Sequence, residues 1–166
     1  MAIDRKALFD RLEELGIAST TVEHEAVFTV EESQELRETL PGAHTKNLFL
    51  TDKEGNAVLV VAKDETRVDL KLVAKRLGVG RLSFGKAERL MQLLGVTPGS
   101  VTPFALLHDR AAGVRVVVDA ALASAAEVNC HPLENTATTR LASVDLFRFI
   151  RACGYEPIVM ALSEAD

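Results

Sequence analysis

The segment TKNLFLTDKEGNAVLVV, residues 45–61, decides the fold because it places two apolar runs on either side of a turn. Its centre, residues 52–56, combines Asp, Gly and Asn, which tight turns prefer. The flanking runs, residues 45–50 and 57–61, contain Thr, Phe and Val, which favour strands. The spacing therefore predicts a β-hairpin.

Helices are predicted around this hairpin from capping residues and from apolar positions at helical intervals. Asp4 begins a first helix that Gly16 ends. Thr29 and Glu32 form a capping box for a second helix that reaches about residue 40. Later helices are expected over residues 69–77, 86–94 and, with Ser143 as its cap, 143–154.

Further strands are expected over residues 20–24, near 82, and over 114–118, 127–131, 136–141 and 157–162. Because strands and helices do not alternate strictly, this order predicts an α/β (mixed α+β) fold with a mixed, largely antiparallel sheet and flanking helices. A chain of 166 residues, 48% hydrophobic and 26% charged, suits a single globular domain over residues 1–166.

Composition excludes several classes of protein. The longest apolar run, residues 57–62, is far shorter than the ~20 residues of a membrane-spanning helix. The N-terminus has no apolar segment typical of a secretory signal, so we expect a cytoplasmic protein with no membrane partner. Cys130 and Cys153 form no CxxC pair and are expected to be reduced packing residues.

The net charge of −5 hides a basic stretch, since residues 63–89 hold eight Lys and Arg against four acids. Such a cluster is typical either of a solvated helical surface or of a phosphate-binding face, and charge alone does not separate the two. The candidates for nucleic-acid contacts in this stretch are Lys63, Arg67, Lys71, Lys75 and Arg81.

Two polar residues are candidates for chemistry because they interrupt or end apolar strands, where burial of a polar group is costly. Lys46 opens an apolar run, and Asn47 is expected to point to the opposite side of the strand. A surface lysine on an edge strand is the alternative. His131 ends a predicted strand where Pro132 forces a loop, and a structural histidine is the alternative there.

Common catalytic and cofactor motifs are absent: the sequence contains no GxGxxG, GxxxxGK[ST], HExxH or GxSxG. His24, His44, Cys130 and His131 match no known metal-ligand spacing, so no metal site is expected. Ser100 and Thr102 lack an evident base and acid, which argues against a catalytic triad.

Three segments carry a resemblance to a known family: GAHTKNLFL (42–50), LGVTPGSVTPF (94–104) and HPLENT (131–136). Together they resemble the YbaK/ProX superfamily, the free-standing relatives of the editing domain of bacterial prolyl-tRNA synthetase. The resemblance covers nearly the whole chain and is greatest to the alanyl-tRNA(Pro) deacylase branch. It implies hydrolysis, in trans, of the ester that joins alanine to mischarged tRNA(Pro). A synthetase pocket sized for proline rejects the smaller alanine by only ~1–3 kcal/mol, so a second, smaller pocket is needed.

The same resemblance implies roles for individual residues. Lys46 would hold the terminal nucleotide through its phosphate or sugar oxygens. Backbone N–H groups of the loop from Gly99 to Pro103 would stabilise the oxyanion, and water would attack with help from the 2′-hydroxyl of the substrate. His131 would place the substrate or help to close a loop. The resemblance implies neither a metal nor an organic cofactor.

The resemblance also implies a substrate pocket. Phe28 and Val30 would form its wall, and Asn47 and Asn129 would donate or accept hydrogen bonds. The other residues expected at the substrate are Thr45, Ser100, Val101, Thr102 and Asn135. The expected partners are the acceptor end of mischarged tRNA(Pro), whose stem phosphates would meet the basic residues, and a prolyl-tRNA synthetase.

Two alternatives remain open at this point. Branches of the superfamily that act on Cys-tRNA or Ser-tRNA share the lysine strand. A non-catalytic nucleic-acid-binding module would also use the basic stretch, although a chain with 5% aromatic residues and no Trp offers few bases a stacking surface.

Overall fold

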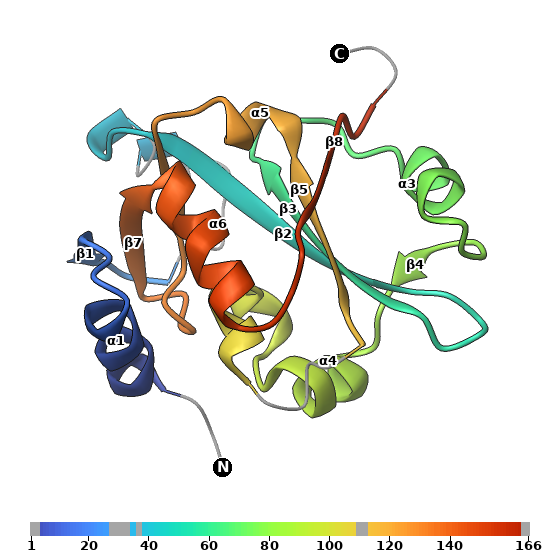
Figure 1. Ribbon diagram of the computed structural model, residues 1–166, viewed down its shortest axis with the longest axis horizontal. Helices are drawn as coiled ribbons and strands as arrows, with labels where there is room; N and C mark the ends of the chain where they lie inside the picture. Colours follow the sequence, from blue (N-terminus) through green and yellow to red (C-terminus); the bar gives the residue numbers. More distant parts are fainter. Residues whose placement is uncertain (1–3, 27–33, 36–37, 109–112, 164–166) are drawn as a thin grey trace.

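A computed structural model describes residues 4–26, 34–35, 38–108 and 113–163 (Figure 1). The strands are β1 (Ser19–Glu23), β2 (Ala43–Thr51), β3 (Ala57–Lys63), β4 (Ser83–Phe84), β5 (Arg115–Asp119), β6 (Glu127–Cys130), β7 (Ala137–Ala142) and β8 (Ile158–Met160). The helices are α1 (Arg5–Glu14), α3 (Leu70–Leu77), α4 (Ala87–Leu94), α5 (Ala120–Ala123) and α6 (Ser143–Ala152), with 3₁₀ turns η1 (Pro98–Ser100) and η2 (Pro103–Leu107). Within these residues, no helix is long and apolar enough to cross a bilayer.

The strands form one mixed sheet in the order β1-β7-β6-β2-β3-β5-β8, and β4 pairs with β2. The pairs β1–β7, β6–β7, β2–β3 and β2–β4 are antiparallel. The pairs β2–β6, β3–β5 and β5–β8 are parallel. The predicted mixed, largely antiparallel sheet is thereby confirmed.

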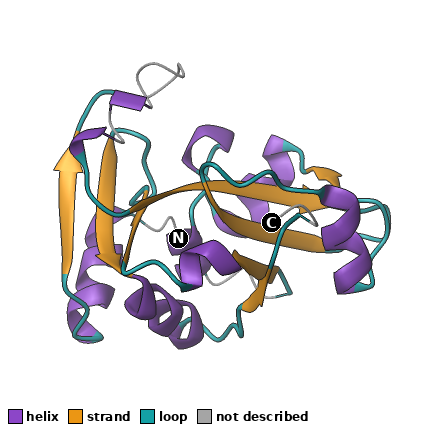
Figure 2. Cartoon of the chain, turned by 90° about the horizontal axis from the view of Figure 1, so that it is seen from above, coloured by secondary structure: helices purple, strands orange, loops and turns teal. Residues whose placement is uncertain are grey.

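Strand β2 joins the two halves of the sheet. On one side it pairs with β3 from Thr45 to Thr51, which is the hairpin expected from the sequence. On the other side it meets β6 only at its first two residues and β4 only at its last two. Figure 2 shows β1 and β7 running steeply across the long central strands. As the halves diverge, the other edge of β2 over residues 45–48 faces no strand in the described part of the chain.

Apolar side chains cover both faces of the sheet, because successive residues of a strand point to opposite sides. Phe49 belongs to a core cluster that includes residues of α1, α4, η2 and α6. Leu50 belongs to a second cluster, on the other face, with residues of α3 and the segment after β8. The sheet is therefore a central layer with helices on both sides.

Local signals in the sequence account for several helix ends. The Asp4 side chain accepts a hydrogen bond from the Ala7 N–H at 3.0 Å, and Asp69 accepts from Lys71 and Leu72. Gly78 ends α3 in the left-handed conformation (φ 69°), which glycine adopts without steric cost. The predicted cap at Asp4 and the predicted helix start at Asp69 are confirmed, whereas Gly78 was not predicted as a helix end.

Three features of the helices differ from the predictions or lie outside the described residues. Ser143 does not cap α6: its hydroxyl donates to the Leu122 carbonyl at 2.7 Å, and Ala142 occupies the cap position without a side-chain bond. The short helix α5 was not predicted; Asp119 caps it through the Ala121 N–H. Of the second predicted helix, residues 34–35 and 38–39 are helical, and the capping box at Thr29 and Glu32 lies outside the described residues.

Candidate functional site

The open edge of β2 lies beside the end of β6. The Thr45 hydroxyl donates to the Asn129 carbonyl at 2.7 Å and lies 3.6 Å from the Cys130 sulfur. Farther along the same edge, the Phe49 carbonyl accepts a hydrogen bond from the Gly85 N–H at 2.9 Å. Since backbone groups of an antiparallel strand alternate in direction, those of Asn47 face the same side as those of Phe49, into the opening.

Two loops far apart in sequence meet next to this edge. The Thr102 hydroxyl donates to the His131 carbonyl at 2.7 Å. A Cβ placed on Gly99 would lie 3.5 Å from Nδ2 of Asn135, which is ordinary contact. The structure thus brings together Gly99, Thr102, His131 and Asn135, which the sequence singled out separately.

Lys46 and Asn47 occupy opposite faces of β2, as expected from the strand alternation. Oδ1 of Asn47 is buried and has no hydrogen-bond partner among the described residues. Lys46 is half-buried, and within the same part of the chain no carboxylate pairs with its ammonium. A buried acceptor without a partner destabilises the free protein. A ligand that donates a hydrogen bond to this oxygen would remove that cost, which favours binding of the ligand.

His131 is held by its backbone and by its ring. Its Nδ1–H donates to the Ala137 carbonyl at 3.1 Å, which leaves Nε2 of the neutral ring as an acceptor. Burial lowers the pKa of His131, the Ala137 bond opposes this, and the nearby His24 lowers it further. The ring is therefore held as a neutral base rather than as a cation at neutral pH.

His24 is a neighbour that sequence reasoning missed as a site residue. Its Nδ1 donates to the Glu25 carbonyl at 2.7 Å, so its Nε2 accepts from the Thr138 hydroxyl at 2.8 Å. Nothing in the spacing of His24 and His131 pointed to their proximity, because strand pairing between β1 and β7 creates it.

Some predicted pocket residues are engaged inside the protein. Nδ2 of Asn129 donates to the carbonyls of Pro41 (2.9 Å) and Ala43 (3.3 Å), so this amide ties β6 to the start of β2. The Val101 side chain packs in the core, and the Ser100 N–H already donates to the Thr97 carbonyl at 2.9 Å. Phe28 and Val30 lie outside the described residues.

The predicted tRNA-contacting residues are spread away from these loops. Lys63 ends β3 directly opposite Thr45, on the paired edge of β2 and therefore across that strand from the open edge. Arg67 follows in the exposed loop, and Lys71 and Lys75 lie on the exposed side of α3. Figure 1 shows α3 at the end of the sheet farthest from β7, and Arg81 precedes β4 there. Of these five residues, Lys63 is the one that lies opposite a predicted site residue, Thr45.

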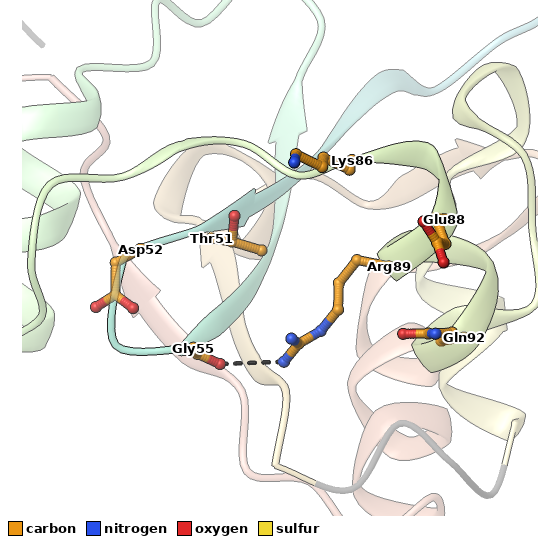
Figure 3. Close-up of a pocket in the computed structure, with 7 residues that line it drawn as sticks. All are labelled: Thr51, Asp52, Gly55, Lys86, Glu88, Arg89 and Gln92. Atoms are coloured by element: carbon orange, nitrogen blue, oxygen red, sulfur yellow. Dashed lines mark hydrogen bonds between the residues drawn. The ribbon is translucent and has the colours of Figure 1, made fainter.

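A separate pocket of about 310 Å³ lies at the far end of β2 (Figure 3). There Nη2 of Arg89 donates to the Gly55 carbonyl at 3.2 Å. Its lining combines two bases, Lys86 and Arg89, with two acids, Asp52 and Glu88, so it carries no net positive charge. It contains none of the predicted site residues. Across the described ranges, no three His, Cys, Asp or Glu residues are grouped as a metal site would need.

Comparisons with known proteins agree on one family. The model of the aminoacyl-tRNA editing domain family matches residues 24–149. The "Prolyl-tRNA editing protein ProX" of Acetoanaerobium sticklandii is 38% identical over 90% of this chain and 92% of its own. The "Prolyl-tRNA synthetase associated domain-containing protein 1" of Danio rerio is 36% identical over 95% and 86%.

Solved structures agree on the fold. A crystal structure of a candidate trans-editing enzyme for prolyl tRNA synthetase superposes with a TM-score of 0.72 at 22% identity and covers 99% of both chains. At this level of identity, the likeness concerns the arrangement of the elements alone.

Proposed function

The chain belongs to the aminoacyl-tRNA editing domain family, and from this premise we propose that it hydrolyses mischarged aminoacyl-tRNA, with alanine on tRNA(Pro) as the preferred substrate. The names of its relatives refer to prolyl-tRNA editing and to prolyl-tRNA synthetase, which supports a tRNA charged by that synthetase as the substrate.

One observation supports the proposal: Oδ1 of Asn47, on the open edge of β2, is buried without a partner among the described residues, and β6, which leads into the loop of His131, ends beside that edge. Lys46 lies on the other face of the same strand segment. An editing reaction needs a place for the 3′ end of the tRNA, a small space for the amino acid and donors for an oxyanion. The strand edge offers the first, and the loops of Gly99 and His131 offer the others.

In the proposed reaction, water attacks the ester carbonyl carbon, and the bond from that carbon to the ribose 3′-oxygen of the terminal adenosine then breaks. The 2′-hydroxyl assists transfer of a water proton to the leaving 3′-oxygen, so the products are the free amino acid and the uncharged tRNA. The negative charge that develops on the carbonyl oxygen is stabilised by backbone N–H groups of the loop from Gly99 to Thr102. The Ser100 N–H is engaged with Thr97, so the other N–H groups of this loop are the donors. Nε2 of His131 accepts a proton or a substrate hydrogen bond, and Lys46 binds phosphate or sugar oxygens.

The test is deacylation of a panel of charged tRNAs by the purified protein. Ala-tRNA(Pro) is expected to be hydrolysed while Pro-tRNA(Pro) survives, because the pocket excludes the larger ring. Faster hydrolysis of Cys-tRNA(Pro) or of a Ser-charged tRNA would assign the chain to another branch. Binding of tRNA without hydrolysis of any substrate would favour a non-catalytic module.

Lys46→Ala tests the site, with Lys53→Ala as the matched control, since Lys53 is an exposed lysine in the turn between β2 and β3. We expect Lys46→Ala to lower the rate of deacylation at least about 100-fold, equivalent to ~2.7 kcal/mol of transition-state stabilisation, and the control to leave this rate unchanged. A Lys46→Ala protein that is as active as the native one would exclude this site.

A further inference from the structure

Three charged side chains join the N-terminal helix to the loop that carries His131. Arg5, at the start of α1, donates through Nη2 to Oε2 of Glu23 at 2.9 Å, and its Nη1 pairs with the other oxygen. Its Nε is buried and lies in ion-pair contact with Oε2 of Glu134, without the direction of a hydrogen bond. Both carboxylates raise the pKa of the Arg5 guanidinium, which stays charged in any case.

The loop of residues 131–136 adopts a conformation that its own backbone disfavours. Leu133 has φ 71°, and it is the one described residue other than glycine with a positive φ. A side chain with a Cβ is disfavoured there, so contacts from outside must hold the loop. Leu133 packs against the core, the Thr102 hydroxyl holds the His131 carbonyl, and the His24 N–H donates to the Thr136 carbonyl at 2.9 Å.

Glu134 is the side chain of this loop that is tied to a charge outside it. The Arg5 side chain is 23% exposed and that of Glu134 is 54% exposed, so Arg5 is the shielded and positioned partner. Glu134 precedes Asn135, which faces Gly99, and follows His131 by three residues. Displacing the loop at Glu134 would therefore move both residues that face the proposed reaction.

We infer that Arg5 is a positioning residue: through Glu134 it holds loop 131–136, and hence His131 and Asn135, in the arrangement that hydrolysis requires. This inference rests on the proposed function for its catalytic consequence, and on the structure alone for its effect on the loop. Glu23, which lies opposite Ala137 in the β1–β7 pairing, orients the Arg5 guanidinium through both of its carboxylate oxygens.

The experiment compares Arg5→Ala and Glu134→Gln with Arg11→Ala, which removes an arginine of the same helix whose partner, Glu14, lies on that helix. We expect Arg5→Ala and Glu134→Gln to lower the single-turnover rate of Ala-tRNA(Pro) hydrolysis about two- to fivefold, because partly exposed ion pairs are worth little more. The dissociation constant for tRNA should not change. The single-turnover rate of the double variant should be no lower than that of the slower single variant.

Hydrogen exchange gives a readout that does not depend on activity. The amides of residues 131–136 are expected to exchange faster in Arg5→Ala and in Glu134→Gln than in Arg11→Ala, with the rest of β6 and β7 unchanged. Glu134→Gln keeps the pair between Arg5 and Glu23, so it decides the question if Arg5→Ala unfolds.

The outcomes separate the two proposals. If the native protein hydrolyses no charged tRNA, the proposed function fails while the exchange experiment still decides whether Arg5 holds the loop. If the native protein is active and both variants match Arg11→Ala in rate and exchange, the role of Arg5 is refuted. Strictly additive losses in the double variant would also refute it, because the two residues would then act independently.

Discussion

Asn47 is a residue that costs stability in the free protein and that we propose binds the substrate. Its Oδ1 is buried without a partner among the described residues, so removing it relieves a desolvation cost. We predict that the free energy of unfolding of Asn47→Ala, measured by chemical denaturation, differs from that of the native protein by no more than about 1 kcal/mol. The variant should nevertheless deacylate Ala-tRNA(Pro) at least about tenfold more slowly.

Asn56→Ala is the contrasting variant for this measurement. The Asn56 amide donates to Asp52 at 2.7 Å in the turn after β2, so its removal should lower stability without slowing deacylation. A large loss of stability with full activity in Asn47→Ala would show that Asn47 is structural.

His131 predicts a pH dependence of stability. Burial lowers its pKa in the folded protein, so the unfolded chain binds the proton more tightly. The stabilisation that depends on a neutral His131 ring is fully present above the pKa of about 6.5 that this residue has in the unfolded chain. This part of the free energy of unfolding is lost as pH falls through the lower pKa of the residue in the folded protein. Denaturation at about pH 7.5 and about pH 5.5, on either side of that unfolded pKa, should therefore show a larger loss of stability in the native protein than in His131→Gln. Equal losses in the two proteins would mean that the His131 ring does not lower the stability in acid.

Among the individual elements, we predict that α3 contributes to the affinity for tRNA and does not take part in the hydrolysis step. Lys71 and Lys75 are exposed on a helix that packs on the second core cluster, away from the two loops. The double variant Lys71→Ala/Lys75→Ala should weaken tRNA binding and reduce the slope of log K against log salt by about two, because each lysine neutralises one phosphate. The deacylation rate at saturating tRNA should not change.

The matched control for α3 is Lys6→Ala/Lys53→Ala, which removes the same charge from exposed positions on α1 and in the β2–β3 turn. If both double variants change the salt dependence equally, the effect reflects net charge, and α3 is not a specific contact.

At the scale of the whole molecule, the two cysteines report how well the packed sheet and helices exclude solvent from the thiols. Burial raises the pKa of Cys130 to about 12, opposed by the Thr45 hydroxyl, and raises that of Cys153 to about 11, opposed by Arg11. We predict that in a Cys153→Ala variant the Cys130 thiol reacts with iodoacetamide at about pH 8 only when the protein unfolds globally. Mass spectrometry with and without denaturant measures this. Rapid labelling of the folded variant would show that β2 and β6 separate locally.

Residue types and their spacing along the chain were enough to predict most of the strands and helices, although not the short helix α5. Asp4 and Gly16 act at the two ends of the first helix as expected, the next helix begins after Asp69 as expected, and the two apolar runs around residues 52–56 form the predicted hairpin. Such signals act between residues close in the chain, where side-chain chemistry and backbone geometry suffice. The motif residues Lys46, Gly99 and His131 were also identified from the sequence, through the resemblance of their segments to a family.

Which of these residues meet was settled only when the elements packed together. Three features depend on how β2 divides its pairing between β6 and β4 and on where α1 docks. They are the approach of the Asn135 amide to Gly99, the unpaired edge at Asn47 and the ion pair between Arg5 and Glu134. Ser143 shows the same limit, since its hydroxyl bonds to Leu122 across the fold instead of to its own helix. Contacts over such separations follow from the packing of whole elements, which no local pattern of residues encodes.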